Sequence, residues 1–106
     1  MRFSGKIVMI TGAGVGIGRA CALRFAQQGA EGLVLLDVNA DTLQALEKEL
    51  EEYPVSVMSG VLDVGDEARV NEMVAQAVAR FGRVDVLVNN AGLWRCWQSF
   101  LDTPTS

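Results

Sequence analysis

The glycine-rich segment that follows residues 6–11 has the residue types and spacing needed to hold a phosphate. It reads TGxxxGxG, with Gly12, Gly16 and Gly18 in the glycine places, whereas GxGxxG fails because Ile17 occupies its third place. A turn without side chains lets the backbone approach a pyrophosphate, and a helix starting there offers unpaired N–H groups and partial positive charge. The alternative is a plain tight turn between a strand and a helix. A phosphate is expected at Gly14, Val15, Gly16 and Ile17.

An acidic residue, Asp37, lies nineteen residues after Gly18, at the end of a second apolar run. This is close to the separation of about 20 residues at which a carboxylate accepts hydrogen bonds from the adenosine ribose of a dinucleotide. A carboxylate there repels the additional 2′-phosphate of NADP, and neither Val15 nor Val38 supplies a compensating positive charge. Asp37 therefore favours NAD as the cofactor, against the alternative of a solvated residue at a strand end.

Two further polar clusters follow later apolar runs. The third run is followed by Asp63 and Val64, and the fourth by Asn89, Asn90, Ala91 and Gly92. The carboxyl ends of parallel strands meet at one edge of a sheet, where ligands bind in such folds. Alternatively, Asp63 caps the helix that follows it, and the two asparagines only tie loop backbone together. Both alternatives are compatible with cofactor binding.

The elements that position these residues alternate between strands and helices. Apolar runs predict four buried strands, over residues 6–11, 33–37, 55–62 and 84–88. Apolar residues at helical spacing predict three helices between them, over residues 16–28, 41–51 and 66–81. Right-handed crossovers assemble this βαβαβαβ order into an α/β fold with a doubly wound parallel sheet, a partial Rossmann-type fold in strand order 3-2-1-4.

The residues at the helix ends and on the helix faces refine this prediction. The first helix is expected to bury a stripe of Ile17, Cys21 and Phe25 and to end at Gly29. The second helix is expected to begin at a cap formed by Asn39 or Asp41. The third is expected to end at Gly82. The pair Ser59 and Gly60 weakens the prediction of the third strand.

With these motifs in order, residues 5–92 resemble the classical short-chain dehydrogenase/reductase family. The resemblance implies that the glycine turn holds the pyrophosphate of NAD(H) and that Asp37 binds the adenosine ribose. It also implies that Asp63 and Val64 contact the adenine and that the Asn-Asn-Ala-Gly segment steadies the sheet beside the cofactor. The expected reaction is hydride transfer between the nicotinamide and an alcohol or carbonyl substrate.

The residues that perform this reaction in the family are not recognised in the chain. Family members use a tyrosine with a lysine four residues later and a serine, all after the Asn-Asn-Ala-Gly segment. The single tyrosine, Tyr53, is followed four residues later by Val57, so no catalytic residue is assigned. We expect a binding unit at residues 1–92 and the truncated start of a catalytic portion at 93–106, with negligible turnover by the chain alone. The alternative is a non-enzymatic module that binds NAD or joins a partner subunit.

Composition excludes several other functions. The net charge of -4 disfavours nucleic acid and anionic membranes as partners, and no apolar run approaches the ~20 residues of a membrane span. The start of the chain has no secretion signal, so a cytoplasmic location is expected. Cys21 and Cys96 lie far apart in a sequence without histidine, so no metal site is predicted. The outer edge of the fourth strand is expected to be open, which makes a homo-oligomer through that edge possible.

Overall fold

The computed structural model describes residues 3–13, 16–63 and 65–89 of the chain. The strands are β1 (Ile7–Thr11), β2 (Gly32–Asp37), β3 (Ser56–Val61) and β4 (Val86–Asn89). The helices are α1 (Gly16–Gln27), α2 (Ala40–Leu50) and α3 (Glu67–Phe81). Within the described residues, no helix combines the length and the apolar character needed to cross a membrane.

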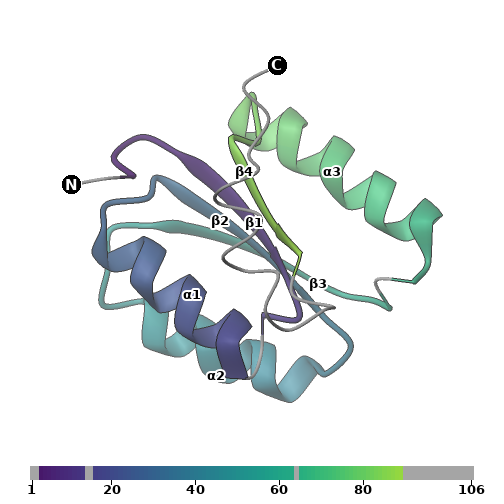
Figure 1. Cartoon of the computed structure of the whole chain (residues 1–106), viewed down its shortest axis with the longest axis horizontal. Coiled ribbons are helices and arrows are strands. Elements are labelled where there is room, and N and C mark those ends of the chain that lie inside the picture. Colours follow the sequence, from purple (N-terminus) through teal and green to yellow (C-terminus); the bar gives the residue numbers. More distant parts are fainter. Residues whose placement is uncertain (1–2, 14–15, 64, 90–106) are drawn as a thin grey trace.

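The four strands form one parallel sheet in the order β3-β2-β1-β4, as the sequence predicts. Figure 1 shows α1 and α2 on one face of this sheet and α3 on the other. The first two connections run outward along the sheet, from β1 to β2 and from β2 to β3, and the third runs back in the opposite direction to β4. Because all three connections are right-handed, the helix of the third, α3, must lie on the opposite face from α1 and α2. The prediction of a doubly wound, Rossmann-type fold is therefore confirmed.

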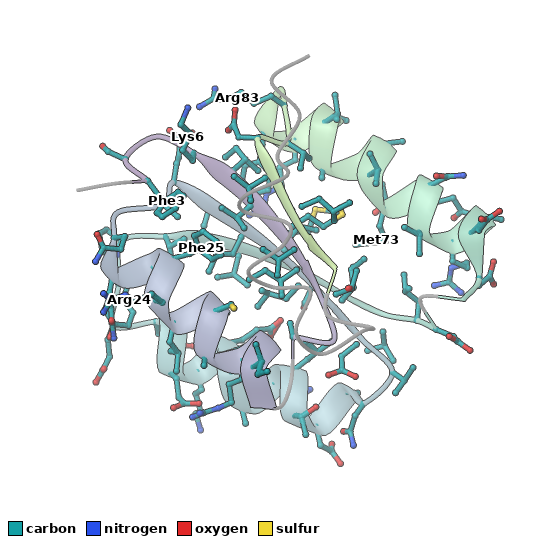
Figure 2. The ribbon with its side chains drawn as sticks, viewed as in Figure 1. Phe3, Lys6, Arg24, Phe25, Met73 and Arg83 are labelled. Atoms are coloured by element: carbon teal, nitrogen blue, oxygen red, sulfur yellow. The ribbon has the colours of Figure 1, made fainter. Side chains whose placement is uncertain are left out.

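The core between the sheet and the pair α1 and α2 is built on the alternation of side chains along β1 and β2. Val8 and Ile10 of β1 and Leu33 and Leu35 of β2 point to this face and are fully buried. Phe25 of α1 packs among them, and its ring meets that of Phe3 edge to face, with centroids 4.7 Å apart. Figure 2 shows Phe25 lying between α1 and the sheet.

The core under α3 depends on two glycines in the sheet. A Cβ atom at Gly60 of β3 would lie 2.8 Å from the Cε of Met73, and one at Gly32 of β2 would lie 2.8 Å from the Phe81 ring. Both contacts are shorter than packed side chains tolerate, so the missing side chains make room for α3. Gly60, which weakened the prediction of β3, is thus a packing site for Met73.

The helix ends follow the predicted signals. Asn39 caps α2, accepting hydrogen bonds from the backbone N–H groups of Asp41 and Thr42 through its side chain. Gly82 ends α3 with a φ of 87°, in the left-handed region, and its N–H donates to the carbonyl of Val78.

Two expectations about burial are wrong, that for Ile17 of α1 and that for β3, whereas Phe25 is buried as expected. The residues of α1 that the fold buries are Gly18, Ala22, Phe25 and Ala26, while the side chain of Ile17 is 45% exposed. Ile17 precedes Gly18 by one residue, which is 100° around the helix, so the burial of Gly18 together with Ala22 and Phe25 turns Ile17 away from the core. In addition, β3 is an edge strand made of exposed and half-buried residues rather than a buried strand, because it pairs only with β2 among the described strands.

Candidate functional site

The carboxyl edge of the sheet gathers the described members of the predicted site. In the parallel register, Thr11 of β1 lies beside Leu36 of β2 on one side and Asn89 of β4 on the other. Asp37 of β2 lies beside Val61 of β3. The ends of four strands therefore place the glycine turn, Asp37, the segment before Asp63 and the backbone of Asn89 at one edge, as expected.

The turn that leaves β1 is fastened to the neighbouring strand. Gly12 has a φ of 64°, which favours glycine, and the N–H of Ala13 donates to the carbonyl of Leu36 over 3.1 Å. Ala13 is fully buried. The turn thus folds back across the end of β2, directly before Asp37.

Helix α1 begins at Gly16. Gly16 has a φ of 58°, and among the described residues no heavy atom lies within 4 Å of the position that its Cβ would take. No acidic side chain lies in the first turn of α1, so the N–H groups and the positive end of the helix dipole are not compensated by a carboxylate of that turn. Ile17 presents its apolar side chain at the same place, whereas Gly18 is buried against the sheet.

Asp37 ends β2 as a half-buried residue between the turn and the third strand. Its Oδ1 accepts a hydrogen bond from the N–H of Val38 over 2.6 Å. Val38 is 64% exposed, so it leaves an uncharged surface beside the carboxylate. The carbonyl of Asp37 accepts from the N–H of Leu62 over 2.9 Å, which fixes the segment leading to Asp63 next to it.

Asp63 is exposed and forms a turn of its own. Its Oδ1 accepts from the N–H of Gly65 over 2.8 Å, and its carbonyl accepts from the N–H of Asp66 over 2.9 Å. The cap of α3 is Asp66, whose side chain accepts from the N–H of Arg69. The alternative that Asp63 caps this helix is therefore wrong.

Several predicted site residues lie outside the described part of the chain. They are Gly14, Val15, Val64, Asn90, Ala91 and Gly92. In the part that is described, no group of three or more histidine, cysteine, aspartate or glutamate residues is placed to hold a metal ion.

Sequence reasoning missed the supporting role of Thr11. Its side chain is buried, and its hydroxyl donates to the carbonyl of Val88 over 3.4 Å, joining the end of β1 to β4. The available signal was a hydroxyl residue at the end of an otherwise apolar strand, because a buried hydroxyl requires a partner.

Tyr53 lies at the opposite edge of the sheet. It precedes β3, and therefore sits near the amino ends of the strands, where its hydroxyl accepts a 3.4 Å hydrogen bond from Nε2 of Gln27 on α1. Its position separates it from the glycine turn by the length of the sheet.

Comparison with known protein families shows which family has this chain as a member. A family model described as short chain dehydrogenase matches residues 6–105. The chain belongs to this family. Solved structures of short-chain dehydrogenases share its fold, with TM-scores of 0.77 and 0.71 in two cases.

Individual relatives show how much of a short chain dehydrogenase the chain spans. The 3-oxoacyl-(acyl-carrier-protein) reductase of Thermotoga maritima is 46% identical over 95 residues, which cover 90% of this chain and 38% of that protein. The L-sorbose reductase of Gluconobacter frateurii, solved with NADPH and L-sorbose, is 40% identical with a TM-score of 0.78, covering 85% of this chain and 34% of that one. A xylitol dehydrogenase solved with NAD+ is also 40% identical, with a TM-score of 0.77 and coverage of 82% and 33%. The chain thus spans about a third to two-fifths of these relatives.

Proposed function

We propose that this chain is the NAD(H)-binding part of a short chain dehydrogenase that transfers hydride between a nicotinamide cofactor and an alcohol or carbonyl substrate. The observation that supports it most directly is the hydrogen bond from Ala13 to Leu36, because it brings the glycine turn and the start of α1 next to Asp37. A dinucleotide requires this combination, with donors for its diphosphate and an acceptor for its ribose hydroxyls.

The diphosphate is proposed to lie against the amino terminus of α1. The open space at Gly16 leaves the backbone accessible, and the absence of an acidic side chain in the first turn removes a source of repulsion. Gly12 and Gly18 shape the turn on either side of this position. By sequence, Gly14 and Val15 complete it.

The adenosine is proposed to lie across the ends of β2 and β3. The carboxylate of Asp37 would accept hydrogen bonds from the ribose hydroxyls, and Asp63 with Val64 would border the adenine. The relatives were solved with NADPH in one case and NAD+ in another, so family membership alone does not select the cofactor. Asp37 and the uncharged Val38 favour NAD, because the phosphate of NADP would meet a carboxylate without a cation to offset it.

The chemistry of the reaction would come from the cofactor, whose nicotinamide accepts or donates the hydride at C4. The residues described here bind and orient it, and Thr11 braces the turn by its hydrogen bond to β4. The residue that exchanges the proton with the substrate is not among them, since Tyr53 lies at the far edge of the sheet. The position of Tyr53 also supports the second candidate function, a module that binds NAD(H) without turnover.

Fluorescence titration of the whole chain with NADH and with NADPH tests the proposal. We expect saturable binding of NADH and at least about tenfold weaker binding of NADPH, which corresponds to about 1.4 kcal/mol. A folded chain that binds neither would contradict the proposed site, and equal affinities would contradict the choice of NAD.

A further inference from the structure

The first turn of α1, on which the proposed diphosphate site depends, has few side chains that contact the core. Gly16 is exposed and lacks a side chain, Ile17 is 45% exposed, and the buried Gly18 offers only its backbone. The other buried residues of α1 all follow this turn, and they are Ala22, Phe25 and Ala26. Apolar packing therefore holds the later part of α1 more firmly than the turn that would meet the ligand.

Arg19 supplies a contact for this turn. Its Nε donates to Oε2 of Glu49 on α2 over 3.1 Å, and its Nη2 donates to Oε1 of the same carboxylate. Two parallel hydrogen bonds between a guanidinium and a carboxylate fix the orientation of the pair as well as its distance. The pair joins residues 30 positions apart and ties the start of α1 to α2, which lies on the same face of the sheet (Figure 1).

Glu49 is a firm point of attachment for this contact. It follows Leu46 by three residues and directly precedes Leu50, and these two leucines are 0% and 1% exposed in the core under α1 and α2. The backbone of α2 at Glu49 therefore cannot shift without disturbing buried side chains. A shift of the first turn of α1 would have to break the pair instead.

The remaining contacts between the facing flanks of α1 and α2 are weaker. An open groove separates these flanks, lined by Leu23 and Gln27 of α1 and by Ala45 of α2. Beyond it, the amide of Gln27 reaches the hydroxyl of Tyr53 over a long hydrogen bond of 3.4 Å. In the part of the chain that the structure describes, the Arg19–Glu49 pair is the only ion pair between the two helices.

The chemistry of the pair suits a geometric role better than a direct electrostatic one. The two charges cancel, so the pair as a unit neither attracts nor repels a diphosphate. Its side chains are 42% and 41% exposed, and ion pairs with such exposure contribute little to stability. Hydrogen bonds from N–H groups weaken steeply as their angle opens, and the helix dipole acts within the first turn only. A small shift of this turn would therefore weaken binding without unfolding the chain.

We propose that Arg19 and Glu49 are positioning residues, which hold the first turn of α1 in the orientation that binds the diphosphate of NAD(H). The inference rests on the proposed function, because it concerns the same diphosphate. Neither side chain touches the cofactor in this arrangement. Each acts through the other, so the loss of either one releases the turn.

A double-mutant cycle on the whole chain, measured by NADH fluorescence titration, tests this proposal. We expect Arg19→Ala, Glu49→Ala and the double variant to weaken NADH binding by a similar factor of about three to ten, because the first substitution already releases the turn. Direct electrostatics requires the opposite sign for Glu49→Ala, since removing a negative charge strengthens the binding of an anion. Glu52→Ala is the matched control, because it removes the same charge from an exposed position after α2 and should leave the affinity unchanged.

Two further measurements separate positioning from a general loss of stability. Thermal unfolding should show a Tm lowered by at most a few degrees in each variant, so that the chain stays folded at the titration temperature. Amide hydrogen exchange should become faster at Ala20 and Cys21 in the Arg19 and Glu49 variants, because these N–H groups bond to the carbonyls of the first turn in the α-helical pattern. The Glu52 variant should keep the wild-type exchange rates.

The possible results distinguish this inference from the proposed function. Unchanged or tighter NADH binding by Glu49→Ala, additive losses in the double variant, or wild-type exchange rates at Ala20 and Cys21 would each overturn the positioning role and leave the proposed function in place. A folded wild-type chain that binds no NADH would contradict the proposed function and, with it, the role of the pair.

Discussion

Asp85 and Ile7 are joined by two hydrogen bonds at the amino edge of the sheet. The carboxylate of Asp85 accepts from the N–H of Ile7 over 2.8 Å, and the N–H of Asp85 donates to the carbonyl of Ile7 over the same distance. Arg83 adds an ion pair to Asp85 at 2.9 Å and also donates to the carbonyl of Gly5. Figure 2 shows Arg83 and Lys6 at this end of the molecule. The contact sets the register of β4 on β1, and hence the pairing of Thr11 with Asn89 at the far edge.

Replacement of Asp85 should therefore weaken the fold in a pH-dependent way. Partial burial on its own raises the pKa of Asp85, but the N–H of Ile7, the hydrogen bond and charge of Arg83 and the charge of Lys6 outweigh it and lower the pKa. A carboxyl with a lowered pKa stabilises the fold above its unfolded pKa of about 3.9, and this stability is lost as the pH falls through the folded value. We expect Asp85→Asn to lower the free energy of unfolding at pH 7 by about 1–2 kcal/mol.

Urea denaturation at a series of pH values measures this difference. The difference in the free energy of unfolding between wild type and Asp85→Asn should become smaller below pH ~4, where the wild-type carboxyl becomes protonated and loses its charge. Asp41→Asn, at an exposed position on α2, is the control and should show a smaller change. A gap that stays constant down to the lowest pH would show that the charge of Asp85 does not contribute.

Replacement of Asp37 should change both affinity and cofactor preference. Asp37→Ala removes the proposed acceptor of the ribose hydroxyls, and hydrogen bonds to a charged group contribute about 1.5–3 kcal/mol, or at least about tenfold in affinity. NADH titrations should therefore give a higher Kd, while the discrimination against NADPH should shrink because the repelling charge is gone. Glu52→Ala removes the same charge from an exposed position before β3 and should change neither. Unchanged affinities in Asp37→Ala would refute its assigned role.

Gly16 and Gly82 form a matched pair for testing the glycine turn. Both have a positive φ and, in the part of the chain that the structure describes, no heavy atom within 4 Å of the Cβ position, so each substitution by alanine should cost about 1–2 kcal/mol of stability from backbone strain alone. Only Gly16 lies at the proposed diphosphate position. Thermal unfolding should show similar losses for Gly16→Ala and Gly82→Ala, whereas NADH titration should show weaker binding for Gly16→Ala alone.

The position of Tyr53 predicts the absence of a catalytic role. Tyr53→Phe should leave the affinity for NADH unchanged, because the side chain lies at the opposite edge and bonds only weakly to Gln27 among the contacts described. We also expect negligible hydride transfer to alcohol or carbonyl substrates by the chain alone, measured by NADH absorbance. Turnover that depends on Tyr53 would refute this prediction and the proposed placement of the cofactor together.

The sequence was sufficient to predict the sheet order, because β1 and β2 are continuous apolar runs and turn residues separate the elements. It also placed the start of α2 at Asn39 or Asp41 and the end of α3 at Gly82, and the structure selects Asn39 as the cap of α2. These features could be predicted because each depends on residues only a few positions apart in the sequence.

The parts that the sequence could not predict depend on contacts between distant elements. Ile17 has the spacing of a buried residue, but α1 turns Gly18, Ala22 and Phe25 inward instead and leaves Ile17 45% exposed. The hydrogen bonds from Ala13 to Leu36 and from Leu62 to Asp37 use backbone groups, which no residue type reveals. The roles of Gly14, Val15, Val64, Asn90, Ala91 and Gly92 remain predictions from motif alone.

The proposed crevice lies at the ends of β1 and β2, the two interior strands, whose apolar residues are buried on both faces. Local opening starts where few buried contacts oppose it, so the amides of β3 and β4 should exchange with solvent deuterium sooner than those of Val8–Ile10 and Leu33–Leu36. The cofactor would then rest on the slowest-exchanging part of the protein, and fraying of either outer strand would leave the platform beneath the diphosphate intact.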